Sequence, residues 1–91
     1  MTTVRVEVSK YDINRAEKDP SQCPITRSIS KKLGKNLFDV DVDGESVYVW
    51  DEYDHPSEVY TFDDSSVLKF IYNWRAMESV EPFKFEMTKR N

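Results

Sequence analysis

The sequence predicts a single α+β domain over residues 1–91, in the order β-α-β-β-β-α-β, with a mainly antiparallel sheet and two helices on one of its faces. Three features lead to this prediction. Several runs alternate apolar and polar residues, which is the period of a half-buried strand. Asp43 and Gly44 separate two of these runs, and such a pair is typical of a tight β-hairpin turn. Two other segments repeat their apolar residues at helical spacing, and a 91-residue chain that is 38% hydrophobic and 33% charged suits one soluble domain.

The first third of the chain is expected to form one strand and one helix. In residues 3–8, valines alternate with charged side chains, which predicts the first strand. Residues 11–20 lack a clear period, so we expect an irregular connection there with at most one helical turn. Residues 22–33 carry an apolar stripe and form the first expected helix, with Ser21 as its N-cap and Gly34 at its C-terminal end.

The middle of the chain is expected to form the hairpin. With Asp43 and Gly44 as the two turn residues, Val40 lies opposite Val47, and the apolar residues of both strands share one face. The opposite face then mixes acidic and aromatic side chains. Its residues are Leu37, Asp39, Asp41, Ser46, Tyr48 and Trp50.

The last third adds two strands and a helix. A fourth strand is expected at residues 58–62 and a last strand at 80–87, where Pro82 indicates an edge or the start of the ladder. Between them, Asp63 or Asp64 is expected to cap a second helix, whose wide apolar stripe predicts that it is well buried. The stripe comprises Val67, Leu68, Phe70, Ile71, Tyr72 and Trp74.

With two helices on one face, the other face of the sheet is expected to be open to solvent or to a partner. Strand alternation predicts which side chains it displays. They are Arg5, Glu7, Asp39, Asp41, Tyr48, Trp50, Lys84 and Glu86.

Charge is strongly segregated along the chain, although the net charge is only −4. Residues 1–35 hold eight Lys or Arg and four Asp or Glu, whereas residues 36–68 hold ten Asp or Glu and no Lys or Arg. Such an acidic region disfavours nucleic-acid phosphates and favours a basic partner. The plain alternative is that the acidic residues keep a small protein soluble.

Metal binding is not predicted. Asp39, Asp41 and Asp43 followed by Gly44 match the first half of an EF-hand calcium loop. The second half does not match, because Trp50 stands where the loop needs a bidentate carboxylate. The sequence therefore favours a β-hairpin here, and it predicts no cofactor.

Catalysis is not predicted either. Cys23 at a helix start and His55 beside Asp54 contain the residue types of a nucleophile, a base and an orienting group, but no known spacing links them. A carboxylate pair of the glycosidase type would need a cleft that so short a chain has little room to build. Two glycines in the whole chain are too few for a glycine-rich phosphate loop.

The outer side of the hairpin is instead the predicted protein-binding site. In the expected register Asp39 lies across from Tyr48, so rings are surrounded by carboxylates, as in an interface hot spot with a polar rim. The predicted binding residues are Asp39, Asp41, Tyr48, Trp50, Asp51 and Glu52. The rings of Tyr48 and Trp50 have three alternative packing partners: an external protein, a second copy of the chain, and another part of the same chain.

The sequence also resembles a group of small uncharacterised proteins of tailed bacteriophages. The resemblance rests on "YDIN", on "CPITRSI" at a helix start, and on the closing "FIYNW…VEPFKFEM" with its Pro-Phe-x-Phe strand. It implies a phage accessory protein that acts in the cytoplasm of an infected bacterium. The acidic hairpin is not part of the shared pattern, so no functional residue follows from the resemblance.

Our leading hypothesis from the sequence is a non-catalytic accessory protein that binds, and thereby inhibits, a host or defence protein with a basic surface. If that surface ordinarily holds nucleic acid, the carboxylates would act as a nucleic-acid mimic; no direct nucleic-acid or membrane binding is expected. The alternatives are a small-molecule or nucleotide-binding protein or small enzyme with a pocket between the second helix and the sheet, and a structural homodimer. One cysteine and no long apolar run fit an expected cytoplasmic location.

Overall fold

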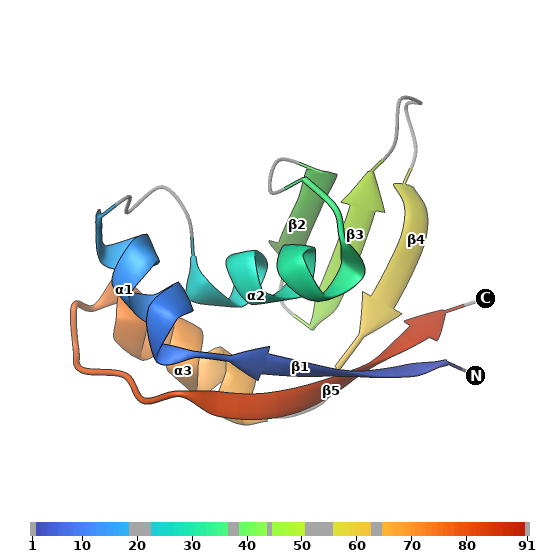
Figure 1. Ribbon diagram of the computed structural model, residues 1–91. Coiled ribbons are helices and arrows are strands. Elements are labelled where there is room, and N and C mark those ends of the chain that lie inside the picture. The colour runs from blue at the N-terminus through green and yellow to red at the C-terminus, as the bar shows by residue number, and fades with distance from the viewer. Residues whose placement is uncertain are drawn as a thin grey trace.

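The structure is a computed structural model that describes residues 2–18, 23–36, 39–43, 45–50, 56–62 and 65–90. Its elements are β1 (Thr3–Val8), α1 (Lys10–Lys18), α2 (Pro24–Leu33), β2 (Val40–Asp43), β3 (Ser46–Trp50), β4 (Pro56–Thr61), α3 (Ser65–Arg75) and β5 (Phe83–Arg90). The five strands form one antiparallel sheet in the order β1-β5-β4-β3-β2 (Figure 1). The predicted α+β class is confirmed, with three helices in the described part of the chain in place of the two expected.

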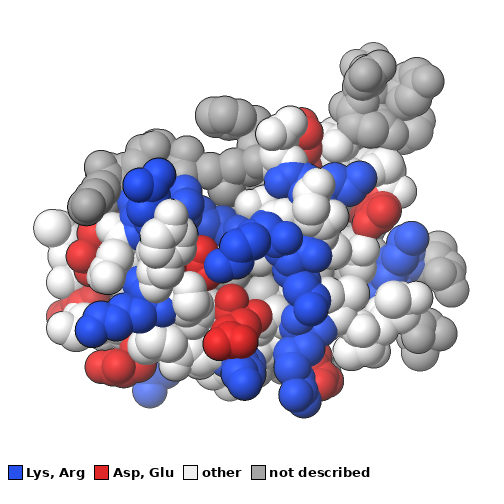
Figure 2. Space-filling model, in the orientation of Figure 1, with Lys and Arg blue, Asp and Glu red and all other residues white. Residues whose placement is uncertain are grey.

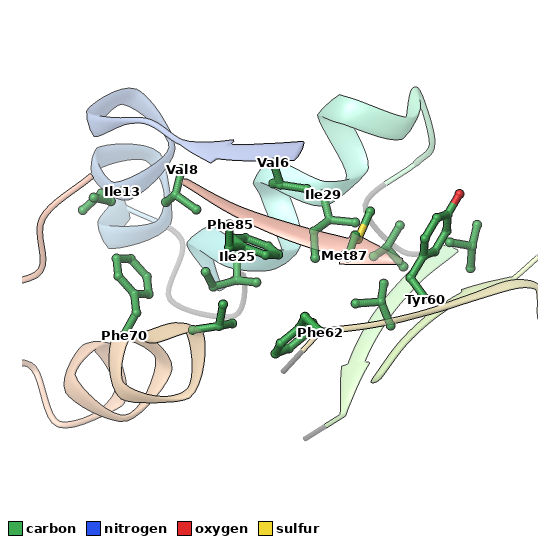
Figure 3. Packing of buried hydrophobic residues seen from close by; sticks show 14 residues of the cluster. Val6, Val8, Ile13, Ile25, Ile29, Tyr60, Phe62, Phe70, Phe85 and Met87 are labelled. Carbon is green, nitrogen blue, oxygen red and sulfur yellow. The ribbon is translucent and has the colours of Figure 1, made fainter. Parts of the chain in front are cut away.

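One hydrophobic core lies between the sheet and the helices. It joins inward-facing residues of all five strands to Ile13 of α1, Ile25 and Ile29 of α2, and Val67 and Phe70 of α3. Figure 3 shows these side chains converging from the helices onto the strands. All three helices therefore cover the same face of the sheet. The opposite face, called the outer face below, is covered by no helix of the described ranges.

The strands at the chain ends pair with each other. Val6 lies opposite Phe85, and Val8 lies opposite Phe83, as the predicted alternation of the first strand requires. The last strand begins at Phe83, not at residue 80, and continues to Arg90. Pro82 explains the late start, since proline has no N–H to donate to the ladder.

The β2–β3 hairpin forms as predicted, but its register was wrong. Asp43 pairs with Ser46, so Gly44 and Glu45 separate the strands. The two-residue slip preserves which residues face inward, because the side-chain period of a strand is two. It also places every inward valine of one strand opposite a valine of the other, Val42 with Val47 and Val40 with Val49.

Helix α1 replaces the irregular connection that we expected. Its start is a capping box, the pattern Ser-x-x-Asp. The Ser9 Oγ accepts the Asp12 N–H at 3.2 Å, and the Asp12 carboxylate accepts the Ser9 N–H at 3.2 Å. Ile13 and Ala16, three residues apart, bury one side of the helix. This signal was present in the sequence and was missed because so few apolar residues follow it.

Helix α2 begins one residue after its N-cap, Cys23, and not after Ser21, which lies outside the described residues. Pro24 suits the first helical position because the N–H it lacks would be unpaired there. Gly34 ends the helix as predicted. Its φ of 68° is the left-handed conformation that glycine adopts without a steric cost, and the Lys35 N–H closes the turn on the Ser30 carbonyl at 2.9 Å.

Helix α3 is less buried than the sequence predicted. Only Val67 and Phe70 are buried, whereas Leu68 is 39% exposed and Tyr72 is 74% exposed. Ile71 and Trp74 are half-buried and pack against the core, so Leu68 and Tyr72 are the members of the predicted stripe that face solvent. Its expected caps, Asp63 and Asp64, lie outside the described residues.

Candidate protein-binding face

The outer face of the sheet is organised in rows, because residues that pair across antiparallel strands lie side by side on the same face. One row runs Asp41, Tyr48, Val59 and Arg90. The next row crosses all five strands and runs Asp43, Ser46, Thr61, Thr88 and Thr3. The sequence alternation fixes which residues share this face, and the strand order fixes which of them are neighbours.

Carboxylates and rings share one half of this face, which we call the acidic half and define by Asp41, Asp43, Tyr48 and Trp50. The carboxylates at 41 and 43 are exposed, and both rings are half-buried. Strands β2, β3 and β4 contain no Lys or Arg, and no ion pair involves these two carboxylates within the described residues. The acidic half therefore presents uncompensated negative charge beside two aromatic rings.

The predicted binding residues divide into three groups. Asp41, Tyr48 and Trp50 lie together on the outer face, as expected. Asp39 does not belong with them: it precedes β2, its N–H donates to the Asn36 carbonyl at 3.0 Å, and the corrected register puts Asp41 opposite Tyr48 in its place. Asp51 and Glu52 lie outside the described residues.

Apart from Arg90 at the end of β5, the other half of the outer face, on β1 and β5, is charge-balanced. Arg5 pairs with Glu86 at 3.4 Å, and Glu7 lies opposite Lys84. All four side chains are exposed, as the alternation predicted, so their mutual attraction contributes little to stability. Basic side chains gather instead on the side of the molecule that carries α1, α2 and β1 (Figure 2). The segregation of charge along the sequence thus becomes a segregation in space.

A polar hollow of about 550 Å³ lies where the five-strand row crosses β3, β4 and β5. It is lined by Glu45, Ser46, Thr61, Phe62, Glu86, Thr88 and Arg90. Its floor of hydroxyl groups borders the acidic half. The sequence did not indicate this hollow, because Ser46, Thr61 and Thr88 become neighbours only through the order of three strands that are distant in the chain.

Beneath the outer face, β4 carries a buried phenol. The Tyr60 hydroxyl donates to the Glu58 carboxylate at 2.6 Å on the inner face of the sheet. Burial, followed by the hydrogen bond and the negative charge of Glu58, raises the pKa of Tyr60 to about 12. The phenol therefore remains a neutral donor at physiological pH and holds two β4 side chains in place behind the outer face.

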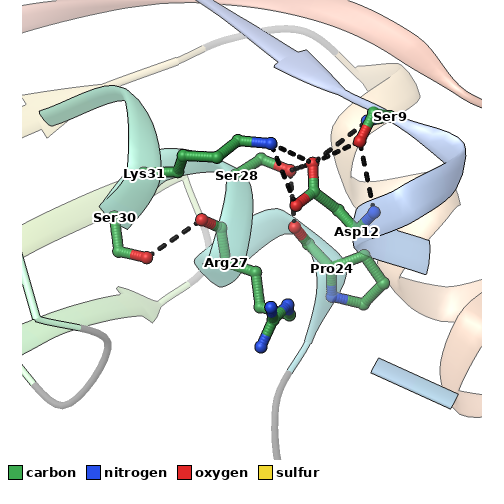
Figure 4. A network of polar contacts seen from close by, with 7 residues as sticks. All are labelled: Ser9, Asp12, Pro24, Arg27, Ser28, Ser30 and Lys31. Atoms are coloured by element: carbon green, nitrogen blue, oxygen red, sulfur yellow. Dashed lines mark hydrogen bonds and ion pairs between the residues drawn. The ribbon is translucent and has the colours of Figure 1, made fainter. Parts of the chain in front are cut away.

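A second polar cluster, which the sequence analysis missed, joins α1 to α2 (Figure 4). The Asp12 carboxylate is 1% exposed and accepts the Ser9 hydroxyl at 2.8 Å, the Ser28 hydroxyl at 3.2 Å and the Lys31 ammonium at 3.1 Å. Burial alone would raise the pKa of Asp12, but the hydrogen bonds from Ser9 and Lys31 and the charge of Lys31 outweigh it and lower the pKa. A carboxylate with this many donors is held ionised and fixed in position, which is the arrangement of a structural link between helices.

The cysteine chemistry considered from the sequence finds no support in the geometry. Cys23 is half-buried at the start of α2, and burial raises the pKa of its thiol despite the nearby positive charge of Arg75. A raised pKa disfavours the thiolate, which is the reactive form. The proposed base, His55, lies outside the described residues.

The described residues also lack two features, a cluster of metal ligands and a membrane-spanning helix. No group of three or more metal-ligating side chains occurs in the described ranges. None of the helices in that part of the chain is long and apolar enough to cross a membrane. Comparison with protein-family models, curated proteins and solved structures finds no match to this chain.

Proposed function

We propose that the protein is a non-catalytic binding protein that docks a basic surface of another protein onto the acidic half of its outer face. The observation that carries this proposal is the pairing of Asp41 with Tyr48 on a half-sheet without a cation. Tyrosine and tryptophan are the side chains most enriched in interface hot spots. The flanking carboxylates would steer a basic partner and reject an acidic one.

The location of these groups on paired strands supports the same proposal. A sheet holds the rings and carboxylates in fixed positions, so little conformational entropy is lost when a partner binds. Carboxylates at regular spacing on a surface without lysine or arginine also suit a partner site that ordinarily holds phosphates. The resemblance to tailed-bacteriophage proteins adds that the partner belongs to the host bacterium or its defences, and that docking inhibits it.

An affinity capture from bacterial lysate tests the proposal. Wild-type protein and the double variant Asp41→Ala/Tyr48→Ala are immobilised at equal density, and the retained proteins are quantified. Loss of one hot-spot ring and one steering charge is expected to reduce the specific partner by about thirtyfold, the equivalent of about 2 kcal/mol. Raising the salt to about 0.5 M should release the partner from wild type, since exposed charge pairs are screened.

The matched control is Glu7→Ala/Lys84→Ala, which removes a facing pair from the charge-balanced half of the same sheet face. It should retain the partner within about twofold of wild type, because rim charges far from the hot spot contribute little. Equal capture by wild type and Asp41→Ala/Tyr48→Ala would remove the acidic half from consideration. Self-capture of this chain as the main product would replace the proposal with the homodimer.

A further inference from the structure

A second, apolar hollow lies away from the acidic half, at the end of the molecule where α1 and α3 terminate (Figure 1). Its volume is about 540 Å³. It is lined by Ala16, Glu17, Trp74, Arg75, Met77, Glu78 and Val80, and we call it the terminal pocket. Ala16 is fully buried, while Trp74 and Val80 are half-buried and pack against the core, so the floor is apolar and firmly supported.

Met77, on the rim of the terminal pocket, has two unfavourable features at once. Its side chain is 94% exposed, and its φ is 62°, in the left-handed region that glycine favours. Met77 lies two residues after the end of α3 and closes the last turn of that helix. Its N–H donates to the Trp74 carbonyl at 3.1 Å, and the Glu78 N–H donates to the Asn73 carbonyl at 2.9 Å. Glycine is the common residue at this position of a helix C-terminus.

The two hydrogen bonds of this helix end account for the left-handed backbone of Met77, but they do not account for a methionine side chain at the position. A side chain that is 94% exposed gains almost no burial energy, so a glycine would serve the fold better at this left-handed position. Methionine is flexible and polarisable, and it recurs on surfaces that bind varied apolar partners. A methionine held outward next to an apolar floor therefore has the properties of a contact residue for something outside the chain.

The charges around the terminal pocket indicate what it contacts. Glu17 and Glu78 are both exposed, and neither forms an ion pair within the described residues. Among the described residues of the lining, Arg75 is the one cation, and its charge acts on the Cys23 thiol at the start of α2. The rim thus presents two free carboxylates beside an apolar floor. These features complement a binding partner that carries an apolar side chain with a cation next to it.

We propose that the terminal pocket is a second docking site, for a segment of a partner protein that presents an apolar side chain flanked by Lys or Arg. A protein segment fits better than a small molecule, because sites for small ligands bury most of the ligand surface. A rim residue as exposed as Met77 leaves the pocket too open for that. This site does not depend on the acidic half of the outer face.

The test separates docking from folding, because Met77→Gly should improve the fold while it removes the contact. Relief of the left-handed strain is expected to raise Tm by roughly 2–6 °C. The binding probe is a displayed library of random dodecapeptides, selected on the Asp41→Ala/Tyr48→Ala variant so that the acidic half makes no contribution. Enriched peptides should carry an apolar residue within two positions of Lys or Arg. They should bind a Met77→Gly version of that bait about tenfold more weakly.

A charge variant completes the design. Glu17→Gln/Glu78→Gln in the same bait should weaken the enriched peptides about threefold or more at low salt and leave Tm within about 2 °C, because both side chains are exposed. Three outcomes would overturn the proposal: no enriched peptide, enriched peptides without a bias toward Lys or Arg, or equal binding to the Met77→Gly bait. A concentration-dependent dimer that Met77→Gly abolishes would also overturn it, since the occupant would then be a second copy.

Discussion

Phe85→Ala is expected to lower the free energy of unfolding by about 3–5 kcal/mol, a large part of the 5–15 kcal/mol typical of a small domain. Phe85 is 3% exposed on β5, the strand that joins β1 to β4. Its ring lies edge-on to Phe62 with a centroid distance of 5.7 Å, and 5.8 Å from the ring of Phe83. Truncation removes both ring contacts and leaves a cavity between the sheet and α2. Urea unfolding followed by tryptophan fluorescence measures the loss.

The control for this prediction is the next residue along the strand. Glu86 points to the outer face, where its partner Arg5 is also largely exposed. Glu86→Ala should therefore change the free energy of unfolding by no more than about 0.5 kcal/mol. Similar losses for the two variants would show that β5 does not alternate between core and solvent as described.

Asp12→Ala is expected to cost about 2–3 kcal/mol, the second largest effect among exchanges of a single residue. The change removes the capping box of α1, worth about 1 kcal/mol, and the charge-assisted hydrogen bonds that tie α1 to α2. The matched control is Lys32→Ala, which should leave the free energy of unfolding unchanged. Lys32 follows Lys31 in α2 but lies outside this cluster. Thermal unfolding of both variants against wild type gives the comparison, and a neutral Asp12→Ala would contradict the structural role.

The pH dependence of the same link follows from the lowered pKa of Asp12. The folded state favours the ionised carboxylate, so this contribution to stability is fully present above the pKa of an unfolded aspartate, about 3.9. It is lost as the pH falls through the lower pKa of the folded state. The stability difference between wild type and Asp12→Asn should therefore be constant from pH 7 to about pH 5 and shrink below about pH 4. A difference that grows on acidification would reverse the assigned direction.

The fold class and most strands could be predicted because the period-2 pattern of valines and phenylalanines is strong on β1, β3 and β5. The exact register of the hairpin could not, because Asp43-Gly44 and Gly44-Glu45 are both suitable two-residue loops and keep the same residues facing inward. Helix α1 was missed for a different reason. Its capping box of Ser9 and Asp12 is present in the sequence, but the contacts of Asp12 with Ser28 and Lys31 of α2 are tertiary contacts that no local pattern contains.

The outer-face position of Asp41, Tyr48 and Trp50 was predictable from alternation alone. The position of Asp39 was not, since it depends on where β2 begins. The polar hollow and the terminal pocket were beyond prediction, because each combines residues from elements that are distant in the sequence. Helix α3 shows the same limit: its apolar spacing predicted a well-buried helix, but the sequence did not show that Leu68 and Tyr72 lie beyond the reach of the core.

The spatial separation of charge gives the molecule two chemically different sides. The side that carries α1, α2 and β1 gathers Lys and Arg (Figure 2). Strands β2, β3 and β4, which carry the acidic half, contain neither residue type. A basic partner approaching in solution is therefore attracted toward the acidic half and repelled by the Lys and Arg side chains of α2. Orientation of the partner before contact follows from this layout and would raise the rate of productive encounters.

Chemical-shift mapping with the captured partner tests the docking surface most directly. The labelled chain is titrated with that unlabelled protein, and amide shifts are followed residue by residue. Docking on the acidic half would perturb Asp41, Asp43, Tyr48 and Trp50 together with Val59, which lies beside Tyr48 on the same face, and would leave the amides of α2 unchanged. Perturbations confined to the helices, with β2 and β3 silent, would contradict it.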